Sequence, residues 1–281
     1  MPFRLWRGAR GGQLQSESMH FLPNWHSVWL VVASFLAGAL NAVAGGGSFL
    51  SFPAMLAVGV APIQANATNT VALWPGQVTS AVALRRELMQ NLRLLLPVGA
   101  ASLIGGTIGA LVLLHTGQAT FMHLVPWLLL VASLLFWFSG PLSRRLQQRA
   151  LLAESQGEAP RKPSRTLLFL ALLVVAFYIG YFGAGSGFLI MSVVAFFGVE
   201  DMHEINALKV VGAGLANGVA VITFIASGAI VWKYCVVAMV LAGIGGYLGA
   251  GASRGVNPNV LRVLVVVIGC SMAAYFFWRP A

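Results

Sequence analysis

The sequence has little charge and few acidic residues. Charged side chains make up 9% of the 281 residues, against roughly 25% in an ordinary soluble domain. There are only seven acidic residues, and none lies deep inside an apolar run, which argues against a cation pump with a carboxylate relay at mid-membrane. Because 58% of the chain is hydrophobic, we predict a membrane protein that has the lipid bilayer as its surroundings.

Other features are also scarce. The two cysteines, Cys235 and Cys270, form neither a CxxC motif nor a disulfide framework. The five histidines lack metal-ligand spacing, and no nucleophile is paired with a base, so no metal, cofactor or enzymatic activity is expected. The net charge of +10 comes from basic residues in the gaps between apolar runs, without interleaved aromatics. We therefore expect no nucleic-acid partner.

What the sequence does contain is an internal repeat. Several blocks of the first half recur in the second half at a nearly constant spacing: Gly105–Ala110 as Gly245–Ala250, Asn66–Ala67 as Asn206–Ala207, Arg93 as Lys233, Gly59–Val60 as Gly198–Val199, and Phe49–Leu50 as Phe188–Leu189. Four segments follow: a polar and disordered N-terminal segment (1–26), a first membrane repeat (27–139), a cytoplasmic linker (140–165) and a second membrane repeat (166–281). A duplicated, apolar chain is typical of a transporter whose site lies between its halves.

Eight apolar runs are long enough to cross the membrane, which takes about 20 residues. They are 27–44, 62–84, 92–114, 120–139, 166–183, 204–227, 232–253 and 259–279. Two shorter runs, 48–59 and 187–198, follow glycine clusters and are predicted to be re-entrant half-helices. The expected fold is an all-α polytopic membrane protein with eight transmembrane helices plus two re-entrant half-helices in two homologous halves.

The placement of basic residues tests the orientation of the halves. Eight crossings with cytoplasmic termini put 14 basic residues inside and two outside, whereas ten crossings with inverted halves put 11 inside and five outside. The positive-inside rule thus favours eight crossings and parallel halves, with both termini in the cytoplasm. Ten crossings with inverted halves remain the alternative.

Two glycine clusters precede the short runs, and they are candidate substrate-binding sites. They comprise Gly45, Gly46, Gly47 and Ser48 in the first half and Gly185, Ser186 and Gly187 in the second. Amide N–H groups at the start of a buried half-helix bind anions. The alternative is that these glycines only permit close helix packing.

Polar residues within apolar spans form the second group of candidates. Asn66, Asn69 and Thr70 lie in the first half, and Asn206 and Lys209 lie at matching positions in the second. They could line a substrate site, or they could hydrogen-bond helices to each other without any substrate.

Lys209 is the only basic residue inside a predicted span. A charge there is costly and usually functional, so Lys209 could balance an anionic substrate. Alternatively it reaches the interface, where Glu200, Asp201 or Glu204 could pair with it.

Four motifs carry a resemblance to a known family. They are Ala-Gly-Gly-Gly-Ser-Phe at 44–49, Ala-Asn-Ala-Thr-Asn-Thr-Val-Ala-Leu-Trp-Pro-Gly at 65–76, Arg-Arg-Glu at 85–87 and Met-His-Glu-Ile-Asn-Ala-Leu-Lys at 202–209. With these motifs, residues 27–279 resemble the TauE/SafE sulfite exporter family. The resemblance implies a bacterial inner-membrane permease for sulfite, sulfonates or related organic anions. Gly-Ala-Gly-Ser-Gly at 183–187 departs from the fuller glycine run of many members.

The sequence therefore predicts a permease that moves a small anionic substrate by alternating access, either alone or as a homo-oligomer. A membrane-embedded assembly or accessory protein without transport of its own is the alternative. The sequence determines neither the anion, nor the direction of transport, nor a coupling ion.

Overall fold

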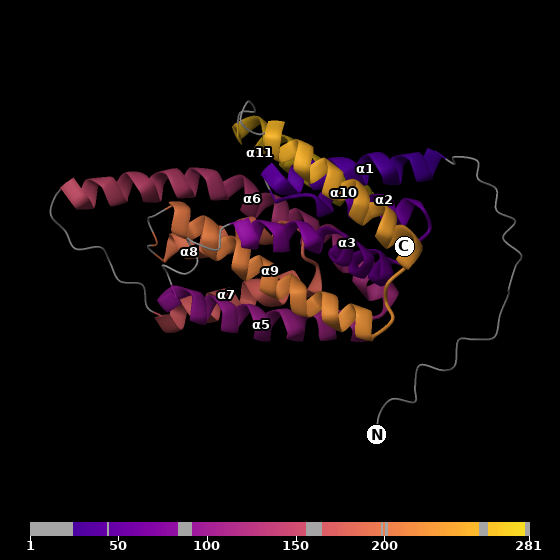
Figure 1. Cartoon of the computed structure of the whole chain (residues 1–281), viewed down its shortest axis with the longest axis horizontal. Coiled ribbons are helices and arrows are strands. Elements are labelled where there is room, and N and C mark those ends of the chain that lie inside the picture. Colours follow the sequence, from indigo (N-terminus) through magenta and orange to yellow (C-terminus); the bar gives the residue numbers. More distant parts are fainter. Residues whose placement is uncertain are drawn as a thin grey trace, which may run out of the picture.

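The computed structural model is all-helical in the part of the chain that it describes, which is residues 25–43, 45–83, 92–155, 165–197, 199, 202–252 and 258–278. Ten helices lie in these residues (Figure 1). They are α1 (Trp25–Val43), α2 (Ser48–Ala57), α3 (Pro62–Ala83), α5 (Leu92–His115), α6 (Gln118–Ser155), α7 (Arg165–Tyr181), α8 (Ser186–Phe196), α9 (Met202–Ala226), α10 (Trp232–Ala252) and α11 (Pro258–Trp278).

The helices repeat in the same order as the sequence blocks. Helices α7, α8, α9, α10 and α11 are the counterparts of α1, α2, α3, α5 and α6, and their starts follow the spacing of the repeated blocks. The internal repeat is therefore a repeat of five helices. Both short apolar runs form helices, of 10 and 11 residues, and at 1.5 Å per residue each is only about 15 Å long.

Equivalent helices of the two halves run in opposite directions. The ring of Trp127 in α6 contacts that of Phe277 in α11, with centroids 5.0 Å apart, and Ser133 lies against Gly269. Helices α6 and α11, which are repeat equivalents, are therefore antiparallel. Successive helices alternate in direction along the long axis of the molecule (Figure 1).

The expectation of parallel halves is therefore wrong, and the helix directions match the alternative with inverted halves. The charge count misled because it treated each short run as returning to the face from which it entered. In the structure the chain turns back after α1, and α2 carries it to the face where α3 begins, so α1 and α3 run in the same direction (Figure 1).

Each half also contributes one helix that packs against the other half. Helix α5 of the first half packs against α7 and α9 of the second, and α10 of the second packs against α1 and α3 of the first. Small residues permit this contact: a Cβ on Gly109 would overlap the carbonyl oxygen of Phe177, and one on Gly249 would lie 2.6 Å from the Cα of Ala39. Two bundles result, the α10 bundle (α1, α2, α3, α10) and the α5 bundle (α5, α7, α8, α9).

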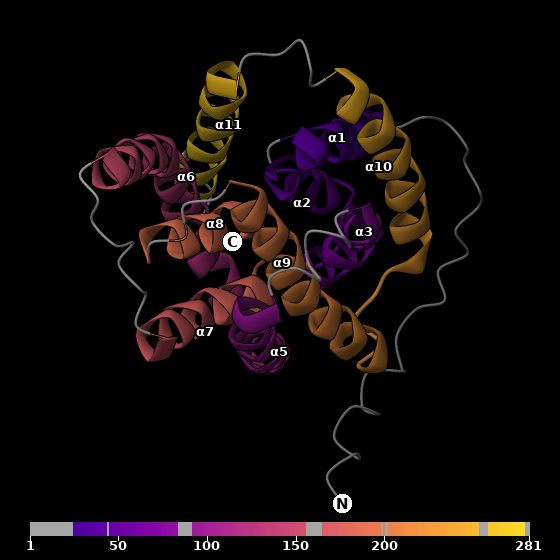
Figure 2. The same cartoon turned by 60° about the vertical axis from the view of Figure 1, so that its left-hand side comes forward.

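The two bundles meet along α3 and α9, while α6 and α11 pack against each other at one side (Figure 2). The Trp74 indole N–H in α3 donates to the Gly214 carbonyl in α9 at 3.0 Å. Their spacing along the chain equals that of Asn66 and Asn206, so Trp74 and Gly214 are repeat equivalents. The approximate twofold axis that relates the halves therefore passes through the α3–α9 contact.

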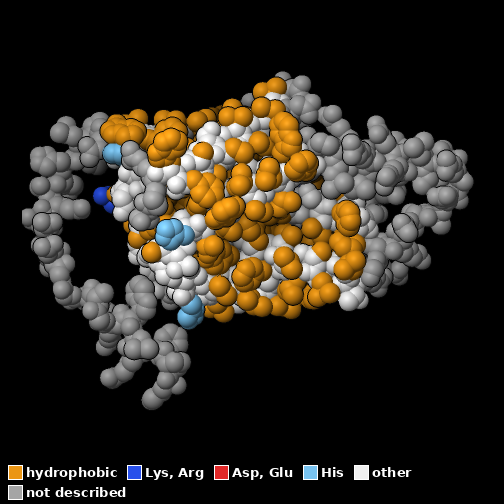
Figure 3. All heavy atoms as spheres, turned by 180° about the vertical axis from the view of Figure 1, so that it is seen from behind, with side chains coloured by type: hydrophobic (Ala, Val, Ile, Leu, Met, Phe, Trp, Pro, Cys, Tyr) orange, Lys and Arg blue, Asp and Glu red, His pale blue; other side chains and the backbone are white. Residues whose placement is uncertain are grey.

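Among the described residues, five helical segments are long and apolar enough to cross a membrane: Trp25–Ala42, Leu95–His115, Gln118–Phe138, Glu204–Ala226 and Trp232–Gly249. On the face drawn in Figure 3, apolar side chains are spread over the described surface between the two ends of the molecule. Trp127, Val174 and Val240 are among the exposed apolar residues. Such a continuous apolar surface is what lipid requires. The protein is a multi-pass membrane protein.

Candidate functional site

The breaks between α1 and α2 and between α7 and α8 face the same small space. Gly45 and Gly183 have φ angles of 80° and 78°, a left-handed conformation that glycine adopts without steric cost. These residues turn the chain so that α2 and α8 each begin inside the molecule. The space between the breaks, which we call the niche, has a volume of about 10 Å³, close to that of one water molecule.

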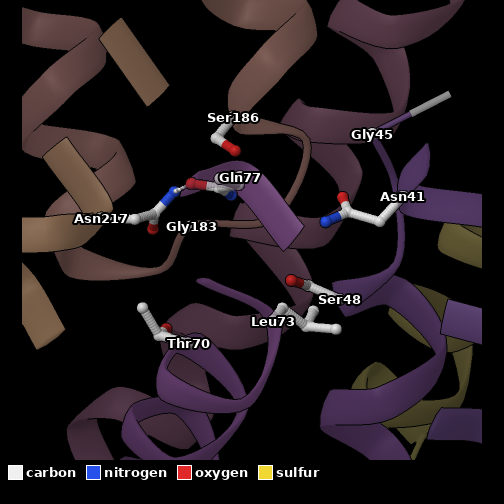
Figure 4. A pocket seen from close by; sticks show the side chains of 9 residues that line it. All are labelled: Asn41, Gly45, Ser48, Thr70, Leu73, Gln77, Gly183, Ser186 and Asn217. Carbon is white, nitrogen blue, oxygen red and sulfur yellow. Dashed lines mark hydrogen bonds between the residues drawn. The ribbon is translucent and has the colours of Figure 1, made fainter. Parts of the chain in front are cut away.

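Most of the niche lining is polar and comes from both halves (Figure 4). The lining residues are Asn41, Gly45, Ser48, Thr70, Leu73, Gln77, Gly183, Ser186 and Asn217. The Asn217 side-chain amide donates to Gln77 Oε1 at 3.1 Å. Since Gln77 and Asn217 are repeat equivalents, the niche lies on the approximate twofold axis.

A larger cavity of about 700 Å³ adjoins the niche and shares Asn41, Gly45, Leu73, Gln77 and Ser186 with it. We call it the wide cavity. Its volume is in the range of ligand pockets, about 300 to 1,000 Å³. Its mouth includes Ser80 and Tyr247, which are exposed. A solute could therefore enter the wide cavity and reach the niche.

Lys209 and Asn206 line the wide cavity from α9, as expected for residues three apart on one helix face. The aliphatic part of Lys209 lies on Gly187, where an added Cβ would be 3.5 Å from Lys209 Cδ. The absence of a side chain at 187 thus makes room for the lysine. Glu200 and Asp201 lie outside the described residues.

The two short helices begin at the niche without side-chain caps. Gly47 and Gly185 occupy their N-cap positions, and neither start has a capping side-chain hydrogen bond. The intrahelical bonds begin with the Phe49 and Phe188 amides, which donate to the Gly46 and Gly185 carbonyls at 3.1 Å each. The amides before them belong to the positive ends of two helix dipoles. Both ends are directed at one polar space.

Some of the predicted site residues line neither cavity: Gly46, Gly47, Gly185, Asn66 and Asn69. Asn69 is buried and accepts a hydrogen bond from the Ser51 hydroxyl of α2, while Asn66 donates to the Tyr181 carbonyl at 3.1 Å. These two asparagines connect helices, which is the alternative role that the sequence left open.

The remaining predicted residues are brought together. Gly45, Ser48, Thr70 and Ser186 line the niche, and Gly187, Asn206 and Lys209 line the wide cavity. The predicted set of site residues did not include Asn41, Gln77 and Asn217, which line the niche. The matching repeat positions of Gln77 and Asn217, and the position of Asn41 just before the first glycine cluster, are the signals that could have identified them.

Comparison with known proteins relates the chain to membrane transporters. Residues 30–276 match the family model described as "Sulfite exporter TauE/SafE". A "Probable membrane transporter protein" of Haemophilus influenzae is 27% identical over 87% of this chain and 92% of its own length. "Probable membrane transporter protein ORF9" of Sinorhizobium is 26% identical over 95% and 96% of the two chains, and "Probable membrane transporter protein YfcA" of Escherichia coli K12 is 26% identical over 87% of each.

No solved structure matches the chain. The family match nevertheless covers nearly all of the residues that form the ten helices. The chain belongs to the sulfite exporter TauE/SafE family of membrane transporters.

Proposed function

We propose that this transporter moves small anions across the membrane by alternating access and that sulfite, sulfonates or related organic anions are its substrates. One observation carries the proposal: two uncapped helix starts and Lys209 surround connected cavities in which no described lining residue is acidic. Positive helix ends and a lysine together favour an anion over a cation or a neutral solute.

In this proposal the Lys209 ammonium and the first amides of α2 and α8 balance the negative charge. Asn206, Asn41 and Ser186 donate hydrogen bonds to the anion's oxygens, which are strengthened because the acceptor is charged. Gly45 shapes the first break and Gly187 accommodates the lysine stem. Asn66 and Asn69 hold the helices that carry these groups.

We further propose that α1–α2 and α7–α8 enter a bacterial inner membrane as hairpins from opposite faces. In this arrangement the linker (140–165) would lie on the face where α6 ends and α7 begins, and α1 would begin and α11 would end at the other face. With the linker inside, 11 basic residues lie in the cytoplasm and five outside, as the positive-inside rule requires. This reverses the expectation of cytoplasmic termini. The wide cavity lies toward the ends of α3 and α10, and in the proposed orientation it is the inward-open site of the transport cycle.

Flux into proteoliposomes tests the proposal. The substitution Lys209→Ala should lower uptake of sulfite or an organosulfonate by about tenfold or more, because a charge-assisted contact is lost. The control is Lys233→Ala, which removes an exposed lysine at the start of α10 that lines neither cavity. Equal flux in both variants would remove Lys209 from the site. The absence of flux for every anion tested, with intact folded protein, would favour the non-transporting accessory protein.

A further inference from the structure

The wide cavity occupies only one end of the contact between the two bundles. Its α3 lining lies within Ala72–Ser80 and its α10 lining within Met239–Tyr247. The two helices run in the same direction, since the Thr68 hydroxyl accepts from the Val231 amide at 3.0 Å and Leu73 packs with Ala242 further along. Their first halves therefore lie toward the opposite face, which we call the closed face.

Four phenylalanine rings fill the region toward the closed face, and we call them the aromatic cluster. Phe52 of α2 contacts Phe121 of α6, Phe182 of the α7–α8 loop and Phe276 of α11, with centroids 5.5 to 6.5 Å apart. Phe121 and Phe182 are also in contact, at 6.2 Å. None of the four is more than 9% exposed. Rings from four separate segments thus pack together in this region.

The aromatic cluster lies directly beyond the niche. Phe182 precedes Gly183, which lines the niche, and Phe52 follows the niche residue Ser48 by about one helical turn. From the mouth inward, the order is the wide cavity, the niche, the aromatic cluster and the closed face. A solute in the niche could proceed only if these rings moved.

The repeat shows that this closure is not shared by the two halves. Phe121 near the start of α6 has Leu261 as its sequence counterpart in α11, and Phe182, which precedes the break at Gly183, has Ala44 before the break at Gly45. Only Phe276 has an aromatic counterpart, Phe136. The place equivalent to the aromatic cluster therefore lacks most of its rings, and that is the end where the wide cavity lies.

We propose that the aromatic cluster is the gate on the closed face, and that it opens when the tip of the α7–α8 hairpin carries Phe182 away from Phe52 and Phe121. The tip is suited to this movement because the residues after Phe182 include Gly183 and Gly185, and loop residues of this kind absorb backbone rotations in hinges. The gate rests on the proposed transport function, because only a protein that passes a solute needs it.

A cysteine reporter in the niche tests the gate. The protein carries Thr70→Cys in a background in which the two native cysteines are replaced by alanine. A membrane-impermeant maleimide is then added either to intact cells or to inverted membrane vesicles, so that each face is probed separately. The reporter should react readily from the open face and slowly from the closed face.

Phe182→Ala should accelerate labelling from the closed face by about tenfold, the factor that a barrier lowered by about 1.4 kcal/mol gives. Phe136→Ala is the matched control. It also removes a buried phenylalanine, which packs edge-on against Phe188 at 4.0 Å, but it lies outside the gate and should leave closed-face labelling unchanged. Phe182→Leu, which keeps an apolar side chain, should give an intermediate rate.

Unchanged closed-face labelling in folded Phe182→Ala and Phe182→Leu proteins would overturn the gate, even if anion flux were normal. Equal acceleration by Phe136→Ala would also overturn it, since loosened packing would then explain the result. Accelerated labelling specific to Phe182, in a protein without any anion flux, would support the barrier but refute the proposed function.

Discussion

The two ends of the contact between α3 and α9 differ although the repeat makes them equivalents. Toward the linker face the wide cavity of about 700 Å³ is lined by Lys209 and small residues such as Gly38 and Ala42. Toward the closed face, Phe121 and Phe182 pack with Ile63 and Phe224 into the largest apolar core of the described residues. A few residue differences between the two repeats therefore leave a cavity at one end and a packed apolar core at the other. Three predictions probe this difference.

The largest effect is expected for glycines of α10. A Cβ on Gly245 would overlap the Phe35 carbonyl oxygen, whereas one on Gly243, which lines the wide cavity, meets nothing within 4 Å. Gly245→Ala should destabilise the protein by about 1 to 3 kcal/mol, as overpacking does. Gly243→Ala should change stability by no more than about 0.5 kcal/mol. Thermal unfolding in detergent measures both, and equal midpoints would contradict the close contact of α1 with α10.

The next largest effect is a difference between two asparagines at equivalent positions of the repeat. Asn66 is buried and bonded to the Tyr181 carbonyl, whereas Asn206 lines the wide cavity. Asn66→Ala should lower the free energy of unfolding by about 1 to 2 kcal/mol, because the carbonyl loses its donor. Asn206→Ala should instead reduce anion flux at nearly unchanged stability. Unfolding and flux measured on both variants decide this, and a loss of stability confined to Asn206→Ala would reverse the assignment.

The smallest effect concerns the bond on the approximate axis. Gln77 and Asn217 pair at 3.1 Å within the niche, and polar bonds between membrane helices couple by about 0.6 kcal/mol on average. A double-mutant cycle with Gln77→Leu and Asn217→Leu should give a coupling of that size in unfolding experiments. A coupling indistinguishable from zero would indicate that this pair is free to rearrange around a substrate.

The sequence predicted the helical class, the repeat and the two short helices, because apolar runs and glycine clusters are local signals. It also singled out Lys209, which lines the wide cavity, while the role of this residue in binding an anion stays a prediction. It did not distinguish Asn69 from Lys209, which stand at matching positions. The surroundings of these two residues differ because each lies beside a different short helix. Ser51 of α2 donates a hydrogen bond to Asn69, whereas Gly187 of α8 leaves room for the Lys209 side chain.

Two features could not be predicted from the sequence. Matching residues such as Arg93 and Lys233 indicate equivalence but carry no information on the direction of each half, so the basic-residue count alone decided it wrongly. The glycines of Gly105–Ala110 and Gly245–Ala250 predict close helix contacts. The pattern does not, however, indicate which helix packs against these glycines. The exchange of α5 and α10 is therefore visible only in three dimensions.

That exchange has a consequence during biosynthesis. When α1 to α3 leave the ribosome, the helix that covers Phe35 and Ala39 has not been made, and it begins about 150 residues after the end of α3, which takes about 8 to 30 seconds at ordinary elongation rates. Throughout this interval the newly inserted helices are an unfinished bundle facing lipid or the insertion machinery. A chain truncated after the linker would leave α5 without its partners too, so neither half is expected to persist alone in the membrane.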